Sequence, residues 1–168
     1  MPIRYWPYFC EENIWHLCGD DQAFGSIPAE ERRVVFITNA RRRVAIRKQR
    51  AGGGGMVLWD YHVALLAGGK VWDLDSTLGC PVDLDVWIQE SFFPLVPGYG
   101  PRFRVIEAPT YRSRFASDRS HMRDAEGRPL KPPPPWAPIG EGMTLMDFVD
   151  LEKPFVGEVL DLDAFRRI

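Results

Sequence analysis

The residues of this sequence that could do nucleophilic chemistry begin with its three cysteines, Cys10, Cys18 and Cys80. No two of them have the short spacing of a zinc site, and an odd number is typical of free thiols in a reducing compartment. Cys10 precedes a predicted helix over residues 11–18, where the positive end of the helix dipole stabilises a thiolate. Cys10 is therefore the candidate nucleophile. Cys18 is predicted to pack on the buried face of the helix, and Cys80 to have no chemical role.

The second chemical group is His62, in a strand predicted from Met56 to Leu66. Gly68-Gly69 predicts a two-residue hairpin turn into a partner strand over residues 70–75. In that register His62 lies opposite Asp75, with Asp73 diagonal to it on the same face. Either carboxylate could orient an imidazole that deprotonates a thiol. The spacing does not choose between the two aspartates, and a structural His–Asp pair in the core explains the pattern equally well.

The elements that must position these residues follow from hydrophobic periodicity and turn residues. Strands are predicted at residues 34–38, 44–47, 56–66, 70–75 and 103–107, and helices at 11–18, 83–93 and from Thr144, with a last strand and helix between Val156 and Arg167. Residues 34–38 and 44–47 are expected to form a hairpin through Asn39. The prolines at 132–135 are expected to pack as a rigid strap rather than to recruit an SH3-like partner. We predict one α+β domain spanning residues 1–168.

Composition narrows the class of protein. The chain has 168 residues, 45% hydrophobic and 26% charged, which are ordinary values for one globular domain and exclude wholesale disorder. Its 21 basic and 23 acidic residues nearly cancel, which argues against a nucleic-acid binder. The basic run Arg41–Arg50 is interpreted as the solvated side of a hairpin. No apolar stretch approaches the roughly 20 residues of a membrane span, and Met1–Phe9 does not have the pattern of a signal peptide.

Four stretches of the chain closely resemble the motifs of protein N-terminal glutamine amidohydrolases. They are Phe9-Cys10-Glu11-Glu12-Asn13-Ile14-Trp15 with Leu17-Cys18, then Trp59-Asp60-Tyr61-His62-Val63, Asp73-Leu74-Asp75, and Phe115-Ala116-Ser117-Asp118-Arg119-Ser120-His121-Met122. The Pro132–Pro135 run matches as well, so the resemblance covers nearly the whole chain in order. One departure is Tyr8, which stands where the family often has a second cysteine. The resemblance implies a papain- or transglutaminase-like fold, with an antiparallel sheet and the nucleophile at a helix N-terminus.

Carried over by motif, the resemblance implies a triad in which Cys10 is the nucleophile, His62 the base and Asp73 the orienting acid. It implies deamidation of a glutamine at the first position of a protein or peptide, through a Cys10 thioester, with release of ammonia. No metal or other cofactor is expected for such a reaction. In eukaryotes the resemblance implies that the new N-terminal glutamate feeds an arginylation-type degradation route.

A free α-amine has to be read by an acceptor, and Glu11, Asp60, Asp75 and Asp118 are the candidate substrate-binding residues. Each could equally be a cap or a surface charge. His121 is the other plausible base and is interpreted as a hydrogen bonder that fixes a loop. The competing hypotheses are a papain-like cysteine protease, a transglutaminase-type enzyme, or a non-catalytic module that binds glutamine termini. We expect a cytoplasmic monomer, also nuclear if the source is eukaryotic, that acts on protein or peptide substrates and binds neither nucleic acid nor membranes.

Overall fold

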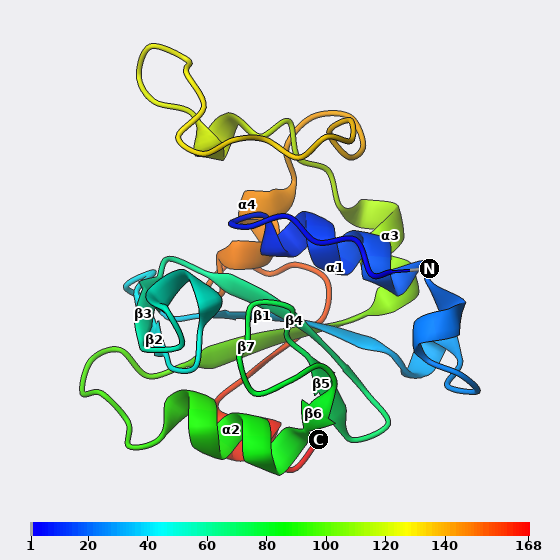
Figure 1. Cartoon of the computed structure of the whole chain (residues 1–168), viewed down its shortest axis with the longest axis vertical. Coiled ribbons are helices and arrows are strands. Elements are labelled where there is room, and N and C mark those ends of the chain that lie inside the picture. Colours follow the sequence, from blue (N-terminus) through cyan, green and yellow to red (C-terminus); the bar gives the residue numbers. More distant parts are fainter. Residues whose placement is uncertain (1) are drawn as a thin grey trace.

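The computed structural model describes residues 2–168, and its main element is a six-stranded antiparallel sheet of order β6-β5-β4-β1-β7-β8 (Figure 1). Its strands are β1 (Arg33–Thr38), β4 (His62–Ala67), β5 (Lys70–Trp72), β6 (Val82–Asp83), β7 (Arg102–Glu107) and β8 (Glu158–Leu160). A separate pair contains β2 (Val44–Ile46) and β3 (Val57–Trp59). The predicted α+β class with an antiparallel sheet is confirmed. Met1, the first residue of the stretch Met1–Phe9 that was compared with signal peptides, lies outside the described residues.

The helices are α1 (Cys10–Cys18), α2 (Leu84–Phe92), α3 (Ala108–Arg114), α4 (Leu145–Val149) and α5 (Leu162–Phe165). Short 3-10 turns occur at Asp21–Ala23, Ala29–Glu31, Arg50–Gly52 and Ser120–Met122. The helices predicted at residues 11–18 and 83–93 and the strand and helix that end the chain are thus confirmed to within a few residues. Within residues 2–168, no helix is long and apolar enough to cross a membrane.

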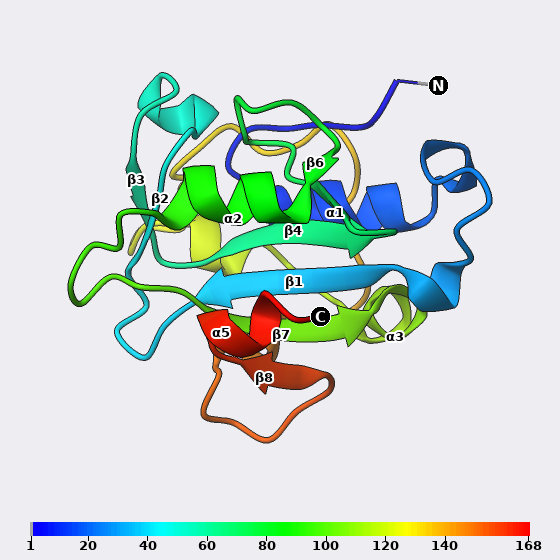
Figure 2. The ribbon, with the colours of Figure 1, turned by 90° about the horizontal axis from the view of Figure 1, so that it is seen from below.

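Helices cover both faces of the large sheet, as Figures 1 and 2 show from two directions. On one face α1, α3 and α4 bury a core that includes Ile14, Leu17, Phe36, Val63, Tyr111 and Phe148. On the other face α2 and α5 bury a core that includes Val35, Ile37, Leu66, Trp87, Ile88 and Phe165. A strand buried on both faces carries apolar residues without alternation. This explains the continuous Val-Val-Phe-Ile run of β1.

The hairpin between β4 and β5 has the predicted register. Ala67 pairs with Lys70 and Leu65 with Trp72, so the turn has two residues. Gly68 and Gly69 both have positive φ, 55° and 72°, as a two-residue turn of the kind that matches strand twist requires. The prediction fails beyond Trp72, because the chain leaves β5 there and Asp73 starts a turn. His62 consequently has no strand partner at Asp75.

The long strand predicted over residues 56–66 is wrong, because β3 and β4 are separate and belong to different sheets. The break falls at Asp60, whose carboxylate accepts the Tyr61 backbone N–H at 3.0 Å. Its carbonyl accepts the Thr38 hydroxyl at 2.5 Å. A side chain that satisfies nearby backbone donors competes with a sheet ladder. Across this corner, the Trp59 ring at the end of β3 stacks on the His62 ring at the start of β4.

The predicted hairpin between residues 34–38 and 44–47 is also wrong. β1 pairs with β4 and β7 in the middle of the large sheet, whereas β2 pairs with β3. The Asn39 side chain stabilises a turn that directs the chain away from β1, so that β2 does not fold back along it. It accepts the N–H groups of Arg41 and Arg43 and donates to the Arg43 carbonyl. The arginines at 41–43 are exposed on this turn, which agrees with the solvated reading of the basic run.

A buried arginine holds the C-terminal part of the chain against the sheet. Arg104 of β7 is 1% exposed, and its guanidinium donates to the backbone carbonyls of Phe148, Asp150, Lys153 and Val156. Its five donors suit several carbonyls at once. The segment between α4 and β8 is thereby fixed by one side chain.

We expect Arg104→Met to lower the free energy of unfolding by about 3 kcal/mol, because it leaves four carbonyls of the 148–156 segment without their donor. Arg102→Met is the matched control on the same strand. The exposed ion pair between Arg102 and Glu152 contributes less than about 1 kcal/mol to stability, so this variant should lose no more than that. Urea unfolding followed by tryptophan fluorescence measures both, and equal losses in the two variants would contradict the assignment.

Candidate active site

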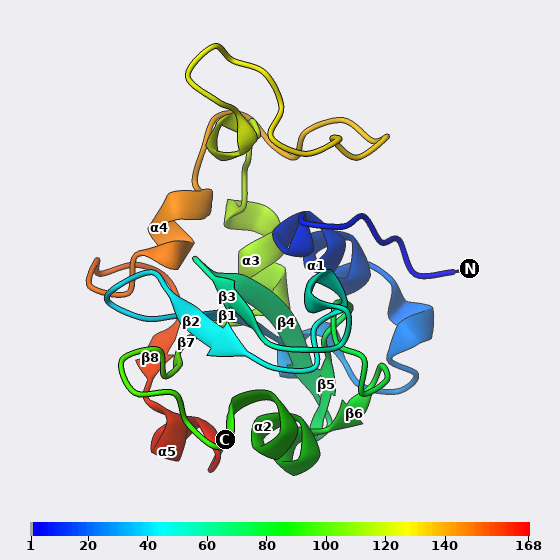
Figure 3. The same ribbon diagram turned by 60° about the vertical axis from the view of Figure 1, so that its left-hand side comes forward.

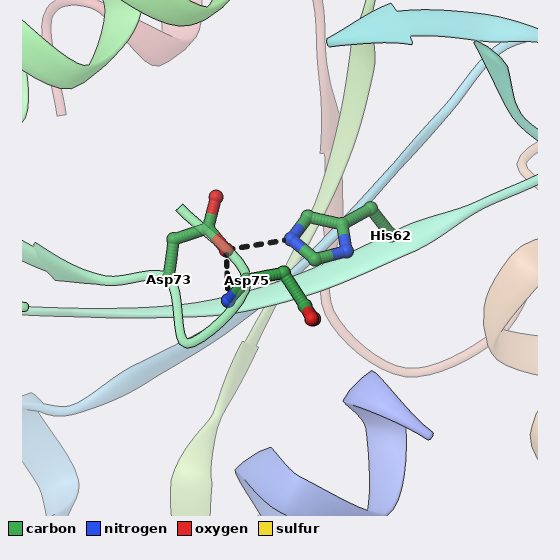
Figure 4. Close-up of side chains that lie close together, drawn as sticks. All are labelled: His62, Asp73 and Asp75. Atoms are coloured by element: carbon green, nitrogen blue, oxygen red, sulfur yellow. Dashed lines mark hydrogen bonds and ion pairs between the residues drawn. The ribbon is translucent and has the colours of Figure 1, made fainter. Parts of the chain in front are cut away.

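His62, the first residue of β4, and Asp73, the residue after β5, form a fully buried pair (Figure 4). His62 Nε2 lies 2.8 Å from Asp73 Oδ1, and that oxygen also accepts the Asp75 backbone N–H at 3.1 Å. Asp73 Oδ2 accepts the indole N–H of Trp87 at 3.1 Å and the Gln49 amide at 3.4 Å. The sequence left Asp73 and Asp75 as alternatives from spacing alone. In the structure, Asp73 is the hydrogen-bond partner of His62.

Each member of this pair favours the charged form of the other. Burial alone would lower the pKa of His62, but the charge and hydrogen bond of Asp73 outweigh it and raise that pKa. Burial alone would raise the pKa of Asp73, but His62 and the Trp87 hydrogen bond hold it below its usual value. Within residues 2–168, no hydrogen-bond partner reaches His62 Nδ1. The imidazole is thus oriented through one nitrogen and has the other available for proton transfer.

Cys10 is the first residue of α1, and its side chain is buried at 8% exposure. The backbone of Val63, the residue after His62, hydrogen-bonds the thiol sulfur. The turn that leads into Cys10 is fixed by Asn13, whose side chain accepts the Trp6 N–H at 2.8 Å and donates to the Trp6 carbonyl at 2.9 Å. The thiol therefore lies at a helix N-terminus next to the strand that carries His62, as the sequence predicted for a helix-borne thiol.

The environment of Cys10 disfavours a free thiolate. Burial, followed by the charges of Glu11 and Asp75, raises the pKa of the Cys10 thiol well above its usual value, against a lowering hydrogen bond from Val63. The thiol lies 3.6 Å from Glu11 Oε2. Burial also raises the pKa of Cys18 to about 12 and of Cys80 to about 11. Of the three thiols in the described residues 2–168, that of Cys10 is the one at a helix N-terminus, and its helix packs against the strand that begins with His62.

A cavity of about 200 Å³ opens onto Cys10. Aromatic side chains of Tyr8, Trp59 and Tyr61 form part of its wall, and the Trp59 ring stacks on His62 at 5.8 Å between centroids. Pockets for drug-sized ligands have volumes of roughly 300–1,000 Å³. A cavity of this size suits a single amino-acid side chain with its backbone.

The four candidate substrate-binding carboxylates have different positions. Asp75 lines the cavity and is only 4% exposed, and one of its oxygens accepts the Tyr5 hydroxyl at 2.7 Å. Asp60 lines the cavity but is exposed. Glu11 is fully buried and is not among the lining residues. Asp118 is exposed, lies outside the cavity lining and accepts the Ser120 N–H.

Residues 117–139, a longer segment that includes the prolines at 132–135, lie over α1 and are called the strap from here on (Figure 3). The strap supplies the rest of the cavity lining, with His121, Met122, Leu130 and Lys131. Within this segment His121 Nε2 lies 3.3 Å from Glu11 Oε1 and 3.2 Å from the Tyr61 hydroxyl. His121 thereby joins the strap to α1 and to the corner before β4. This is the loop-fixing role expected of it from the sequence.

A buried ion pair ties the strap to α1. Arg119 donates through two nitrogens to the two carboxylate oxygens of Glu12, each at 2.8 Å, and Trp136 donates to the same carboxylate at 2.6 Å. Trp6 also donates to the Pro132 carbonyl, which holds the proline run against the N-terminal segment. Sequence reasoning placed Glu12 only at the helix start and gave Arg119 and Trp136 no individual role. Glu12 and Arg119 are 107 residues apart in the chain, so no local sequence pattern could indicate their contact.

The cluster of His62, Asp73 and Asp75 has donor atoms within 4.8 Å of one another, which is close enough to hold a metal ion. However, His62 Nε2 and both Asp73 oxygens are already engaged in hydrogen bonds. Asp75 is likewise engaged with Tyr5. These atoms of the cluster therefore already have protein partners.

A buried thiol at a helix start, an imidazole with one free nitrogen and a carboxylate on its other nitrogen are the parts of a thiol-dependent hydrolase. Comparison with known sequences narrows this class. The sequence profile of the N-terminal glutamine amidase family matches residues 5–168. The chain belongs to that family.

Curated relatives share the similarity over most of their length. Protein N-terminal glutamine amidohydrolase of Homo sapiens is 43% identical over 161 residues, covering 89% of this chain and 78% of the relative. The protein of the same name from Danio rerio is 40% identical, covering 96% of this chain and 86% of the relative. That from Arabidopsis thaliana is 37% identical, covering 82% and 68%. The resemblance seen in the motifs is thus confirmed.

We expect Asp73→Asn to lower the pKa of His62 by at least about 1, because the charge that opposes burial is removed while the side-chain size is kept. An NMR titration of ring-labelled histidines measures it, with His16 and His121 as internal references. Asp85→Asn, an exposed charge removal on α2, is the control and should leave His62 unchanged. An unchanged His62 pKa in Asp73→Asn would contradict the electrostatic role of the pair.

Proposed function

We propose that this chain hydrolyses the side-chain amide of a glutamine at the first position of a protein or peptide, releasing ammonia and leaving glutamate. The family match over residues 5–168 carries the choice of substrate. The hydrogen-bonded His62–Asp73 pair and the buried Cys10, whose helix packs against the strand that carries His62, support the chemistry. The cavity of about 200 Å³ favours one terminal residue over a continuous chain, which needs room on both sides of the reacting bond.

The first half of the proposed reaction acylates the thiol. His62 Nδ1 takes the Cys10 proton, and the thiolate attacks the side-chain carboxamide carbon of the glutamine. Backbone N–H groups at the start of α1, including that of Cys10, stabilise the oxyanion, an effect worth about 3 kcal/mol per donor. The C–N bond then breaks, and protonated His62 gives its proton to the departing ammonia. Asp73 holds the imidazole in the required orientation throughout.

The second half releases the product. A γ-glutamyl thioester on Cys10 remains after ammonia departs, and His62 deprotonates a water molecule that attacks it. The C–S bond breaks, the thiol recovers a proton and glutamate leaves. One amide and one water are consumed for each glutamate and ammonia, so the proposed cycle needs no redox partner. The thiol at the start of α1, together with His62 on β4 and Asp73 just after β5, also supports the proposal that the fold is papain- or transglutaminase-like.

We propose that Asp75 binds the α-amine of the substrate. Of the four candidates it alone both lines the cavity and is buried, so its charge is weakly screened there. Asp60 is exposed to solvent screening, Glu11 is separated from the cavity, and Asp118 lies outside it. A buried carboxylate that meets a protonated amine gives a charge-assisted hydrogen bond. An acetylated terminus has no such charge.

Ammonia release tests the proposed function. We expect the protein to release ammonia from a glutamine-starting peptide and to raise the peptide mass by about one dalton, as expected when an amide is hydrolysed through an acyl-enzyme. The same peptide acetylated at its N-terminus is expected to be inert. Cys10→Ala should abolish the reaction, whereas Cys80→Ser, which changes an exposed thiol, should retain it.

Each alternative has its own outcome in that assay. Cleavage of the peptide chain would indicate a cysteine protease, and comparable turnover of internal glutamine would indicate a general deamidase or transglutaminase-type enzyme. Binding of glutamine-starting peptides without ammonia release would indicate a recognition module. Any of the three would contradict the proposed function.

Asp75→Asn tests the assignment of the α-amine reader. Loss of one charged hydrogen bond corresponds to about a 10- to 150-fold fall in kcat/KM for glutamine-starting peptides. Asp118→Asn is the matched control, because Asp118 is exposed and outside the cavity, and it should change kcat/KM less than about twofold. If Asp60→Asn, and not Asp75→Asn, gave the large loss, the reader would be Asp60 instead.

The other expectations drawn from the sequence stay predictions. They are a cytoplasmic monomer with one domain over residues 1–168, no need of a cofactor, and partners limited to its protein or peptide substrates.

A further inference from the structure

The strand β3 has one hydrogen-bonding edge that meets no other strand. Within residues 2–168, β3 pairs with β2 alone, in a sheet of two strands. It lies at the periphery of the molecule (Figures 1 and 2). Met56 and Leu58 are 49% and 41% exposed, so solvent reaches β3 on the side away from the core.

The register shows which backbone groups lie on this open edge. In an antiparallel pair of strands, hydrogen-bonded and non-hydrogen-bonded residue pairs alternate. Ala45 is opposite Leu58, but its N–H donates to the Tyr99 carbonyl and not to β3. Two residues on, the Arg47 N–H donates to Ser91, which gives the same alternation. The N–H and C=O of Leu58 therefore point away from β2 and put one donor and one acceptor on the open edge.

The open edge leads to the cavity that contains Cys10. Trp59, the last residue of β3, and Asp60, the residue after it, both line that cavity. The lining residues that are exposed, and so mark its mouth, are Asp60, Leu130 and Lys131. A polypeptide whose first residue occupies the cavity has to leave through this mouth. There it passes Asp60 and meets the end of β3.

The direction of such a polypeptide follows from this order. A chain that passes Asp60 first and Leu58 afterwards runs antiparallel to β3. Extended residues advance about 3.3 Å each, and Leu58 lies two residues before Asp60. The third or fourth residue of the substrate therefore comes opposite Leu58. In antiparallel pairing, one residue can exchange both an N–H and a C=O hydrogen bond with its partner.

We propose that the main chain of the substrate, beyond its N-terminal glutamine, adds to the open edge of β3 as an antiparallel strand. Its third or fourth residue exchanges two hydrogen bonds with the backbone of Leu58. This docking rests on the proposed function and adds to it a surface that holds the rest of the polypeptide. The partner of the edge is thus an extended, unpaired polypeptide segment that directly follows the terminal residue.

The shortness of β3 makes this edge selective for an anchored chain. Two hydrogen bonds do not offset the entropy that a free chain loses on association. A chain whose first residue already occupies the cavity has paired effectively within one molecule, at a high effective concentration. Hydrogen bonds to the main chain are the same for every residue except proline, so the edge can accept termini of many sequences.

Peptide length provides the first test. Glutamine-starting peptides of two, three, four, six and eight residues, with amidated C-termini, are compared by the kcat/KM of ammonia release. We expect kcat/KM to rise about ten- to hundredfold between two and six residues and then to level off. Each of the two hydrogen bonds contributes about three- to tenfold to this increase.

Backbone esters test where the substrate pairs. Replacing one amide of a six-residue peptide by an ester removes a single N–H and leaves every side chain in place. We expect kcat/KM to fall about three- to tenfold when the N–H of the third or of the fourth residue is removed. Only one of these two positions should be sensitive, because neighbouring N–H groups of a strand point to opposite sides.

Leu58→Pro tests the protein side of the same pair. Proline removes the N–H of residue 58, and a strand edge that faces solvent tolerates it. We expect the ratio of kcat/KM for the six-residue peptide to that for the two-residue peptide to fall about three- to tenfold. Dividing by the two-residue value corrects for any damage to the fold. Leu58→Thr, which retains the N–H, is the matched control and should keep the wild-type ratio.

Three results would each overturn the docking: a kcat/KM that does not increase with peptide length, an ester scan without a sensitive position, or an unchanged ratio in Leu58→Pro. A dimer in sedimentation that Leu58→Pro dissociates would assign the edge to a second copy of this chain and would overturn the docking as well. Absence of ammonia release from every peptide would refute the proposed function. Equal release from short and long peptides would refute only the docking.

Discussion

The hydrogen bond between His62 and Asp73 is the interaction on which the rest of the site depends. Two ionisable groups without solvent exposure are costly to bury unless every lone pair and proton has a partner. Asp73 meets that requirement with four donors, which come from β4, from its own turn, from α2 and from Gln49 before β3. Each donor belongs to a different part of the chain. The carboxylate therefore needs the fold to be complete, and the imidazole needs the carboxylate.

The two-faced sheet explains why those donors can converge. The α2 helix lies on one face and sends the Trp87 indole to Asp73, whereas α1 lies on the other face and brings Cys10 next to β4. The pair lies where β4 begins and β5 has ended, so groups from both layers can reach it. The corner at Asp60 contributes as well, because it separates β3 from β4 and leaves the Trp59 ring, at the end of β3, stacked on the His62 ring. In a straight strand over residues 56–66, the side chains of Trp59 and His62 would lie on opposite faces of the strand.

The sequence predicted those parts of the site that depend on residues close together in the chain. The helix after Cys10 and the Gly68-Gly69 turn depend on neighbouring residues, and both were predictable with their register. The hairpin assigned to β1 and β2 failed because a central strand chooses partners by burial on both faces, which neighbours in sequence do not reveal. The Glu12–Arg119 pair, 107 residues apart in sequence, has no local signature at all. Between Asp73 and Asp75 the choice depended on one turn after Trp72, and only the family resemblance could make it in advance.

The balance of charge inside the site differs from that of the whole molecule. The chain has a formal net charge of only -2, yet Glu11, Asp73 and Asp75 are all buried within the neighbourhood of one thiol. Coulomb interactions there are far stronger than at the surface, because water screens them less. A site with excess negative charge is poorly suited to a resting thiolate and well suited to a cationic ligand. The burial of these carboxylates is the common cause of both properties.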